Sequence, residues 1–313
     1  MESPGQRLRR GALSAGDKVA ARVARASGDA QRAASGVDLA VAALLQERGV
    51  RDLQDPAGFV ELLRGCWEPL TVAVEAATPG RGSSPAELRF DALLDHLRDG
   101  VGPLPVGVAV DVAEKADRLL ASREPYDRSA LQTDVGTHAR WSSSFGHSAR
   151  ILTAVVRFMR TRTVVEVGTA YGLGALFLAD ALGHGHLPGR LVTIEAAEPQ
   201  QALSRELLAD VDLVTTVAGR TPDVLPKVLS ETGPVDLFFH DGDHSRDAYV
   251  ADFEAALPYL APGAVVLFDD IRWEDPFAVR DVRTAEGWEF VSHHARVLRK
   301  AELGHRYGIL LLS

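Results

Sequence analysis

The sequence predicts an α/β fold, in which a parallel sheet is covered by helices on both faces and is preceded by an α-helical N-terminal domain. Short β-rich runs alternate with helical patterns from Thr163 to the C-terminus, which is typical of parallel sheets with covered faces. Unusual polar residues follow directly after these runs, where sheets of this kind bind ligands. The preceding stretch, Val37–Ser122, contains helical signals only, and it therefore predicts the N-terminal helical domain.

Six segments are predicted to be strands because they are short, rich in β-branched or apolar residues, and bounded by turn residues. They are Thr163–Val167, Arg190–Glu195, Val214–Val217, Val235–Asp241, Ala264–Asp270 and Tyr307–Leu312. Helical patterns lie between most of these segments. Consecutive strands joined by helices are expected to run parallel.

Capping signals predict helices before the sheet. Ser84–Glu87 has the form of a capping box, and the helix that it opens is expected to end near Gly100. Asp55-Pro56 is typical of a helix start, with proline at the first helical position. A further helix is expected over Val108–Ala121.

The domain boundaries follow from changes in composition along the chain. Residues 1–36 are rich in arginine and are expected to form a basic, flexible arm. Residues 37–125 form the predicted helical domain. Residues 126–313 begin in a polar, irregular stretch and contain all the predicted strands, so they form the predicted α/β domain.

The bulk composition excludes several classes of protein. The chain has 313 residues, of which 46% are hydrophobic and 25% are charged, as in ordinary globular proteins. Its net charge is −9, and an acidic body lacks the basic face that nucleic acids require. No apolar run approaches the ~20 residues of a membrane span, and no signal-peptide core is found at the start. We therefore expect a cytoplasmic protein with no nucleic-acid or membrane partner.

A glycine-rich turn follows the first predicted strand. Glu166–Gly174 reads EVGTAYGLG, and its glycines allow a sharp turn and the close approach of a ligand. The spacing differs from the G-x-G-x-x-G pattern of dinucleotide sites. Glu195 ends the second strand about 20 residues further on, where an acid accepts hydrogen bonds from a ribose diol. Gly219, after the third strand, would let a flat base lie against the backbone.

Carboxylates follow the fourth and fifth strands. Asp241 and His244 belong to the segment DGDH, and Asp269-Asp270 ends the next strand. Three carboxylates at one edge of a sheet repel one another unless a cation is present, and Mg²⁺ prefers such hard oxygen ligands. The alternative is that some of these acids only cap the following helices. His244 is the predicted general base, because the ordinary pKa of imidazole lies near neutrality.

The order of these motifs over Ser142–Ser313 resembles the class I S-adenosylmethionine-dependent methyltransferases. Within that class, Asp241–His244 and Gly263–Ile271 (GAVVLFDDI) are similar to the metal-dependent O-methyltransferases. These comprise the catechol O-methyltransferase-like branch and the bacterial antibiotic- and sugar-tailoring enzymes. The resemblance implies a Rossmann-like, seven-stranded sheet with helices on both faces. It also implies S-adenosylmethionine as cofactor and Mg²⁺ or another divalent cation.

The resemblance also implies a role for each motif residue. The cofactor-binding residues would be Glu166, Gly168 and Gly172 at the methionine end, Glu195 at the ribose, Gly219 and Arg220 at the adenine, and Asp241. The metal ligands would be Asp241, Asp269 and Asp270. Apart from the resemblance, we expect His244 and Asp241 to be the catalytic residues. Two positions depart from the catechol branch, which has a lysine base where His244 stands and asparagine where Asp270 stands.

The predicted activity is transfer of a methyl group from S-adenosylmethionine to a hydroxyl of a small molecule, such as a natural product or a sugar. A divalent ion on the acceptor oxygen would lower the pKa of that hydroxyl and hold it near the methyl group. Three alternatives remain: a metal-independent O- or N-methyltransferase with His244 as base, a nicotinamide-dependent dehydrogenase, and a non-catalytic regulatory module. The N-terminal helices are expected to cover the active-site rim or to form a homo-oligomer interface.

Overall fold

The computed structural model describes residues 72–74, 84–99, 110–126, 133–144, 147–184, 189–273, 282–304 and 306–313. The chain divides into two compact units, Met1–Glu68 with Gly102–Arg150, and Pro69–Val101 with Ile151–Ser313. The predicted arm at 1–36 and the predicted helix start at Asp55-Pro56 lie outside the described residues. No helix in the described part of the chain is long and apolar enough to cross a membrane.

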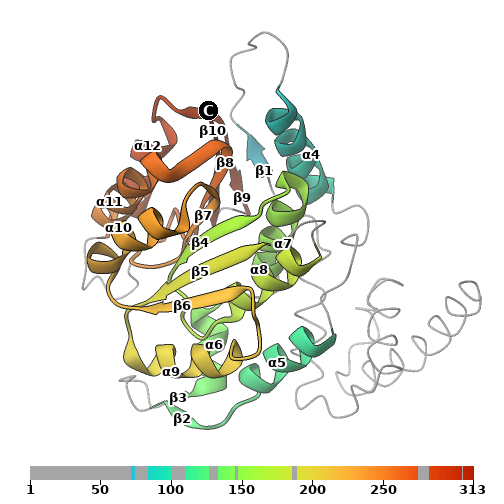
Figure 1. Ribbon diagram of the computed structural model, residues 1–313, viewed down its shortest axis with the longest axis vertical. Helices are drawn as coiled ribbons and strands as arrows, with labels where there is room; N and C mark the ends of the chain where they lie inside the picture. Colours follow the sequence, from blue (N-terminus) through green and yellow to red (C-terminus); the bar gives the residue numbers. More distant parts are fainter. Residues whose placement is uncertain are drawn as a thin grey trace, which may run out of the picture. The chain divides into compact units, whose positions relative to one another are not determined.

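An eight-stranded sheet organises the second unit in the described part of the chain (Figure 1). Its order is β1-β9-β10-β8-β7-β4-β5-β6. Strands β4 to β8 run parallel, whereas β10 runs antiparallel to both β8 and β9. The bounds are β1 Val72–Val74, β4 Thr163–Val167, β5 Arg190–Glu195, β6 Val214–Ala218, β7 Val235–His240, β8 Leu260–Phe268, β9 Val297–Leu303 and β10 Tyr307–Leu312.

The predicted strands are confirmed as β4, β5, β6, β7, β8 and β10, and the α/β fold class is confirmed with them. The resemblance implies seven strands, and the short edge strand β1 adds an eighth. Two strands, β9 and β1, come from segments without a clear strand signal. Strand β9 contains Arg299, Lys300 and Glu302, and its buried positions do not alternate regularly. Strand β1 has three residues, pairs with β9, and comes from the stretch 37–125 that has helical signals.

Helices cover both faces of the sheet. In Figure 1, α10, α11 and α12 lie on one face, and α7 and α8 lie on the other. The first face buries Leu229 of α10, Phe253 of α11 and Val291 of α12 against the strands. The helix bounds in this unit are α4 Pro85–Asp99, α7 His147–Met159, α8 Leu173–Gly183, α9 Glu198–Leu207, α10 Thr221–Thr232, α11 Arg246–Ala256 and α12 Thr284–Ser292.

The capping box before α4 is confirmed. The Ser84 N–H donates to Glu87 Oε2 at 2.8 Å, and the Glu87 N–H donates to Ser84 Oγ at 3.3 Å. Helix α4 ends at Asp99, beside the expected stop at Gly100. Its apolar positions Phe90, Leu93 and Leu97 are fully buried, so the predicted helical spacing marks the packed face.

The first unit contains a small helical assembly in its described residues. Its elements are α5 Val110–Leu120, β2 Pro125–Tyr126, β3 Thr133–Asp134 and α6 Val135–Ser142. Helix α5 confirms the helix predicted over Val108–Ala121. Strands β2 and β3 pair antiparallel, and Asp134 Oδ1 accepts the Thr137 N–H at 2.6 Å. This contact caps α6, as an N-terminal aspartate commonly does.

The strand order reverses direction beside β4. The chain proceeds from β4 outward to β5 and β6, then returns to the other side of β4 for β7 and β8. Open α/β sheets bind ligands outside the carboxyl ends of the strands at such a reversal. The ends of β4 and β7 are therefore the expected place for a site.

We predict that Gly308→Ala destabilises the sheet by about 1–3 kcal/mol, the usual cost of overpacking. A Cβ at Gly308 would lie 2.4 Å from the Trp288 ring, and that ring is held by a 2.9 Å hydrogen bond from its Nε1 to Glu302. Urea unfolding measures the change. Gly183→Ala is the control, because its Cβ would approach nothing closer than 3.8 Å. Equal urea midpoints for the two variants would show that the Trp288 ring moves aside without a loss of stability.

Candidate active site

Gly168 brings the end of β4 against the end of β7. It has φ +92°, and a Cβ there would lie 1.8 Å from the backbone oxygen of Asp241. The Asp241 N–H donates to Val167 O at 2.8 Å, and the Gly168 N–H donates to Ile194 O at 2.9 Å. Only glycine fits this backbone contact, so the glycine turn and Asp241 are placed side by side at the reversal of strand order.

Gly172 begins helix α8. Its φ of +93° lies in the left-handed region, and no side chain caps the helix there. A Cβ would approach Leu207, Leu208 and Ser204 at 3.3 Å. The glycine therefore lets the chain turn from the loop into α8 beneath α9.

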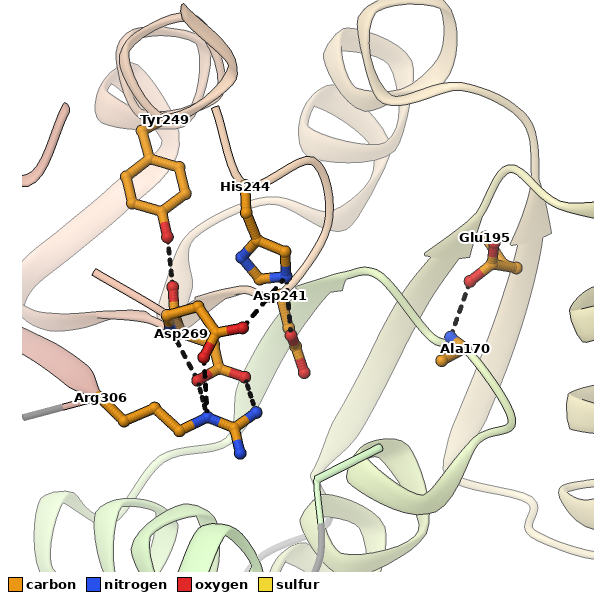
Figure 2. A network of polar contacts seen from close by, with 8 residues as sticks. Ala170, Glu195, Asp241, His244, Tyr249, Asp269 and Arg306 are labelled. Atoms are coloured by element: carbon orange, nitrogen blue, oxygen red, sulfur yellow. Dashed lines mark hydrogen bonds and ion pairs between the residues drawn. The ribbon is translucent and has the colours of Figure 1, made fainter. Parts of the chain in front are cut away.

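Glu195 holds the glycine turn from the end of β5. Its Oε2 accepts the Ala170 N–H at 2.7 Å (Figure 2). Its Oε1 accepts the Ala197 N–H, also at 2.7 Å. Partial burial raises its pKa, and these backbone hydrogen bonds oppose the rise. Each carboxylate oxygen has a second lone pair, so the geometry leaves Glu195 able to accept the ribose hydroxyls predicted for it.

Glu166 lies beneath the turn and is buried. Its Oε2 accepts the Thr193 hydroxyl at 2.5 Å, and the hydroxyls of Thr193 and Thr169 are also 2.5 Å apart. Burial raises the pKa of Glu166 to about 8, against the effect of the Thr193 hydrogen bond. The acid is therefore largely protonated at neutral pH, and its predicted place along the cofactor stays a prediction.

Gly219 and Arg220 follow β6. Gly219 has φ +146°, and a Cβ there would lie 2.6 Å from Val224 Cγ1. Arg220 is exposed and precedes α10. Both lie at the carboxyl edge of the sheet with Glu195, because β6 pairs with β5 in parallel. Their contact with adenine stays a prediction.

Asp269 is a fully buried carboxylate at the end of β8. Its N–H donates to His240 O at 2.9 Å, and its backbone oxygen accepts the Tyr249 hydroxyl. The Asp270 N–H donates to Asp269 Oδ1 at 2.7 Å. These contacts fix the backbone where the chain turns sharply, since Asp270 has φ +53°.

Arg306 provides the positive charge beside these acids (Figure 2). Its Nε lies 2.5 Å from Asp269 Oδ1, and its second terminal nitrogen binds Asp269 Oδ2. The same Nε lies 3.1 Å from Asp270 Oδ1. The backbone of Arg306 is also held, because its carbonyl accepts the Ile271 N–H at 2.9 Å.

His244 lies between the other two carboxylates. Its Nε2 is 3.6 Å from Asp241 Oδ1 and 4.0 Å from Asp270 Oδ2, and its buried Nδ1 has no hydrogen-bond partner. Burial lowers the pKa of His244 to about 4, although the charge of Asp269 opposes the shift. The imidazole is therefore neutral at pH 7, with a lone pair that is able to accept a proton, but burial makes it a weaker base than free imidazole. The structure thus brings His244, Asp241 and Asp270 together, as the sequence predicts.

The predicted metal ligands do not fit Mg²⁺ in this arrangement. Both oxygens of Asp269 are bound by Arg306, and the side chain is buried. Among the described residues, no group of three or more histidine, cysteine or acidic side chains is suited to hold a metal ion. The Mg²⁺ site predicted at Asp241, Asp269 and Asp270 is therefore not confirmed.

Sequence reasoning misses Arg306, although topology supplies a signal for it. Strand β10 is antiparallel to β8, with Gly308 opposite Phe268. A residue just before β10 must therefore lie beside the residues just after β8. The preceding Arg306 is 37 residues from Asp269 in the sequence, and only the strand order reveals the pairing.

Comparisons with known proteins agree with this architecture. Residues 165–271 match a family described as "Methyltransferase domain". The SAH-bound Podospora anserina methyltransferase PaMTH1 has a similar structure, with TM-score 0.52 and 15% identity over 76% of this chain and 99% of that chain. Residues 165–271 therefore resemble a methyltransferase domain, and the second unit shares the fold of that methyltransferase. The matched segment runs from β4 to the residue after Asp270, and it excludes Arg306.

Two further proteins are similar to this chain. The structure of the O-methyltransferase from Bacillus cereus in complex with SAH is 20% identical, with TM-score 0.49, and covers 73% of this chain and 100% of that chain. The uncharacterized protein y4gI of Sinorhizobium fredii is 26% identical over 168 residues, which cover 50% of this chain. The chain spans 18% of that relative's length.

We predict that Glu166→Gln flattens the dependence of stability on pH. In the native protein the pKa of Glu166 is raised to about 8, so the folded state holds a proton that the unfolded chain releases. This contribution is complete below the unfolded pKa of 4.5 and is lost as the pH rises through about 8.

Urea unfolding at about pH 6 and about pH 9 tests this prediction. The native protein should lose a few kcal/mol more than the Gln variant between these conditions. Glu231→Gln is the control, because Glu231 is exposed on α10, and it should keep the native slope. Equal slopes for all three proteins would exclude a protonated Glu166.

Proposed function

We propose that this methyltransferase transfers a methyl group from S-adenosylmethionine to a hydroxyl of a small molecule. One observation carries the proposal: the glycine turn held by Glu195 lies against Asp241, which is next to the neutral His244. The proposed cofactor-binding turn and a proton acceptor would therefore lie at the same edge of the sheet. The SAH-bound state of the Podospora methyltransferase supports the choice of cofactor.

The residues would divide the work as follows. Glu195 and the glycine turn would bind the cofactor, which would supply a methyl group activated on a sulfonium. His244 Nε2 would take the proton of the acceptor hydroxyl as that oxygen replaces the sulfur on the methyl carbon. Asp241 and Asp270 lie within 4.0 Å of that nitrogen, so their charge favours the imidazolium that forms.

Of the metal-dependent and metal-independent versions, the geometry favours the metal-independent one. Arg306 binds both oxygens of Asp269, so a metal ion at the predicted ligands would have to displace a bidentate guanidinium. The neutral His244 provides a base without a metal. The match to a methyltransferase family also disfavours a dehydrogenase.

The acceptor and the assembly state belong to the proposal as well. A hydroxylated natural product or sugar would place its oxygen near His244, whereas an amine acceptor is the alternative for the same base. We further propose that the N-terminal region contributes to a homo-oligomer or to the rim of the site. Because the chain spans a small part of its curated relative, these statements concern this domain.

We predict that His244→Ala lowers turnover by about 10²–10⁴-fold, the usual contribution of a general base. S-Adenosylmethionine affinity should change little, because the side chain lies at the acceptor side of the site. Mass spectrometry of labelled products from a panel of hydroxylated compounds measures turnover, and calorimetry measures affinity. His293→Ala is the control, since His293 is exposed and directly follows α12. Native turnover in His244→Ala would remove this residue from the mechanism.

We predict that Glu195→Ala weakens S-adenosylmethionine binding by about 1–3 kcal/mol, because it leaves polar partners unmet. Glu195→Gln should lose less, since the amide oxygen still accepts one hydrogen bond. Titration calorimetry gives both affinities. Glu206 is exposed on α9, so Glu206→Ala is the control for the loss of a surface charge. Unchanged affinity in Glu195→Ala would place the ribose elsewhere.

A further inference from the structure

The acidic rim of the methyltransferase domain contains its own cation. Asp241, Asp269 and Asp270 follow two neighbouring parallel strands, so three carboxylates lie at one edge of the sheet. A buried carboxylate such as Asp269 is costly unless it is paired and hydrogen-bonded. Arg306 meets both requirements, because two of its nitrogens bind the two oxygens of Asp269.

Arg306 is held by backbone and side-chain contacts, although its side chain is partly exposed. Its carbonyl accepts the Ile271 N–H at 2.9 Å, and its N–H donates to Leu303 O at 3.2 Å. Its guanidinium lies 5.2 Å from the centre of the Tyr307 ring, within the range of a cation–π contact. A planar guanidinium bound at two points is a specific geometry, so its charge stays beside Asp269.

We propose that Arg306 is a built-in counter-charge that takes the place of a divalent cation at this rim. The guanidinium binds Asp269 on both oxygens and also contacts Asp270, which are two of the three carboxylates that a metal would need. The side chain therefore offsets one of the negative charges at the rim and occupies both oxygens of Asp269, which a metal would need. Arg306 acts as a positioning residue, because it fixes Asp269 and Asp270 beside His244 and does not itself react.

This inference rests on the proposed function only for the location of the acceptor. Metal binding is measurable without turnover, and the two ideas therefore fail separately. If the native protein transfers no methyl group, the proposed function is refuted, and the proposed role of Arg306 still stands. Inhibition by a chelator would refute the role of Arg306 and leave methyl transfer standing.

The test is a titration of Mn²⁺ followed by electron paramagnetic resonance of the free ion, on the full chain. We expect the native protein to bind no Mn²⁺ at the rim. Arg306→Gln should gain a site, seen as a stoichiometric loss of the free Mn²⁺ signal that the native protein does not show. Arg306→Lys keeps the charge and should bind no Mn²⁺. Arg272→Gln is the matched control, because Arg272 pairs with Glu302 instead, and it should stay without a site.

A double variant covers the case in which Arg306→Gln does not fold. Arg306→Gln with Asp269→Asn removes both buried charges, so it should fold and bind no Mn²⁺. Circular dichroism and S-adenosylmethionine binding report folding in each variant. Stoichiometric Mn²⁺ binding by the native protein that Asp269→Asn abolishes would overturn the proposal. A folded Arg306→Gln variant without gained affinity would also overturn it.

Discussion

The contact between Gly168 and the backbone of Asp241 is the constraint on which the site depends. A turn at the end of β4 must meet the end of β7 with no side chain between them. This contact occurs where the strand order reverses, so the loops on either side diverge and leave room for ligands. The proposed functional residues lie at one of these two strand ends or at a neighbouring one. Glu195 contacts the turn after β4, and His244 lies in the loop that begins with Asp241.

The carboxylates at this edge illustrate how burial separates similar groups. Asp269 is buried and paired with Arg306, whereas Asp270 has its pKa raised to about 6, first by burial and then by the charge of Asp269. Glu166 is buried with a hydroxyl as its partner and keeps its proton at neutral pH. Acidic residues that look equivalent in the sequence therefore differ in charge, because each has a different partner.

Much of this arrangement is predictable from local sequence. The strands with continuous apolar runs, such as Ala264–Phe268, are found where their composition places them, and the residues after them lie at one edge because parallel strands share direction. Strand β9 is not predictable in this way, since Arg299 and Lys300 interrupt its pattern. Arg306 is harder still, because its pairing with Asp269 follows from register between distant strands. The local sequence pattern predicts the helices and strands, whereas the pairing of charged residues depends on the order of the strands in the sheet.

The antiparallel insertion of β10 between β8 and β9 has a consequence for where the residues of the proposed site lie in the chain. It delivers the chain's final hairpin to the acidic edge, outside the segment that matches the methyltransferase family. The residues proposed to bind the cofactor and the arginine proposed to replace a cation thus lie in separate stretches of the chain. In this proposed scheme, a substitution at Arg306 would change the charge of the acidic edge while the glycine turn and Glu195 stay the same.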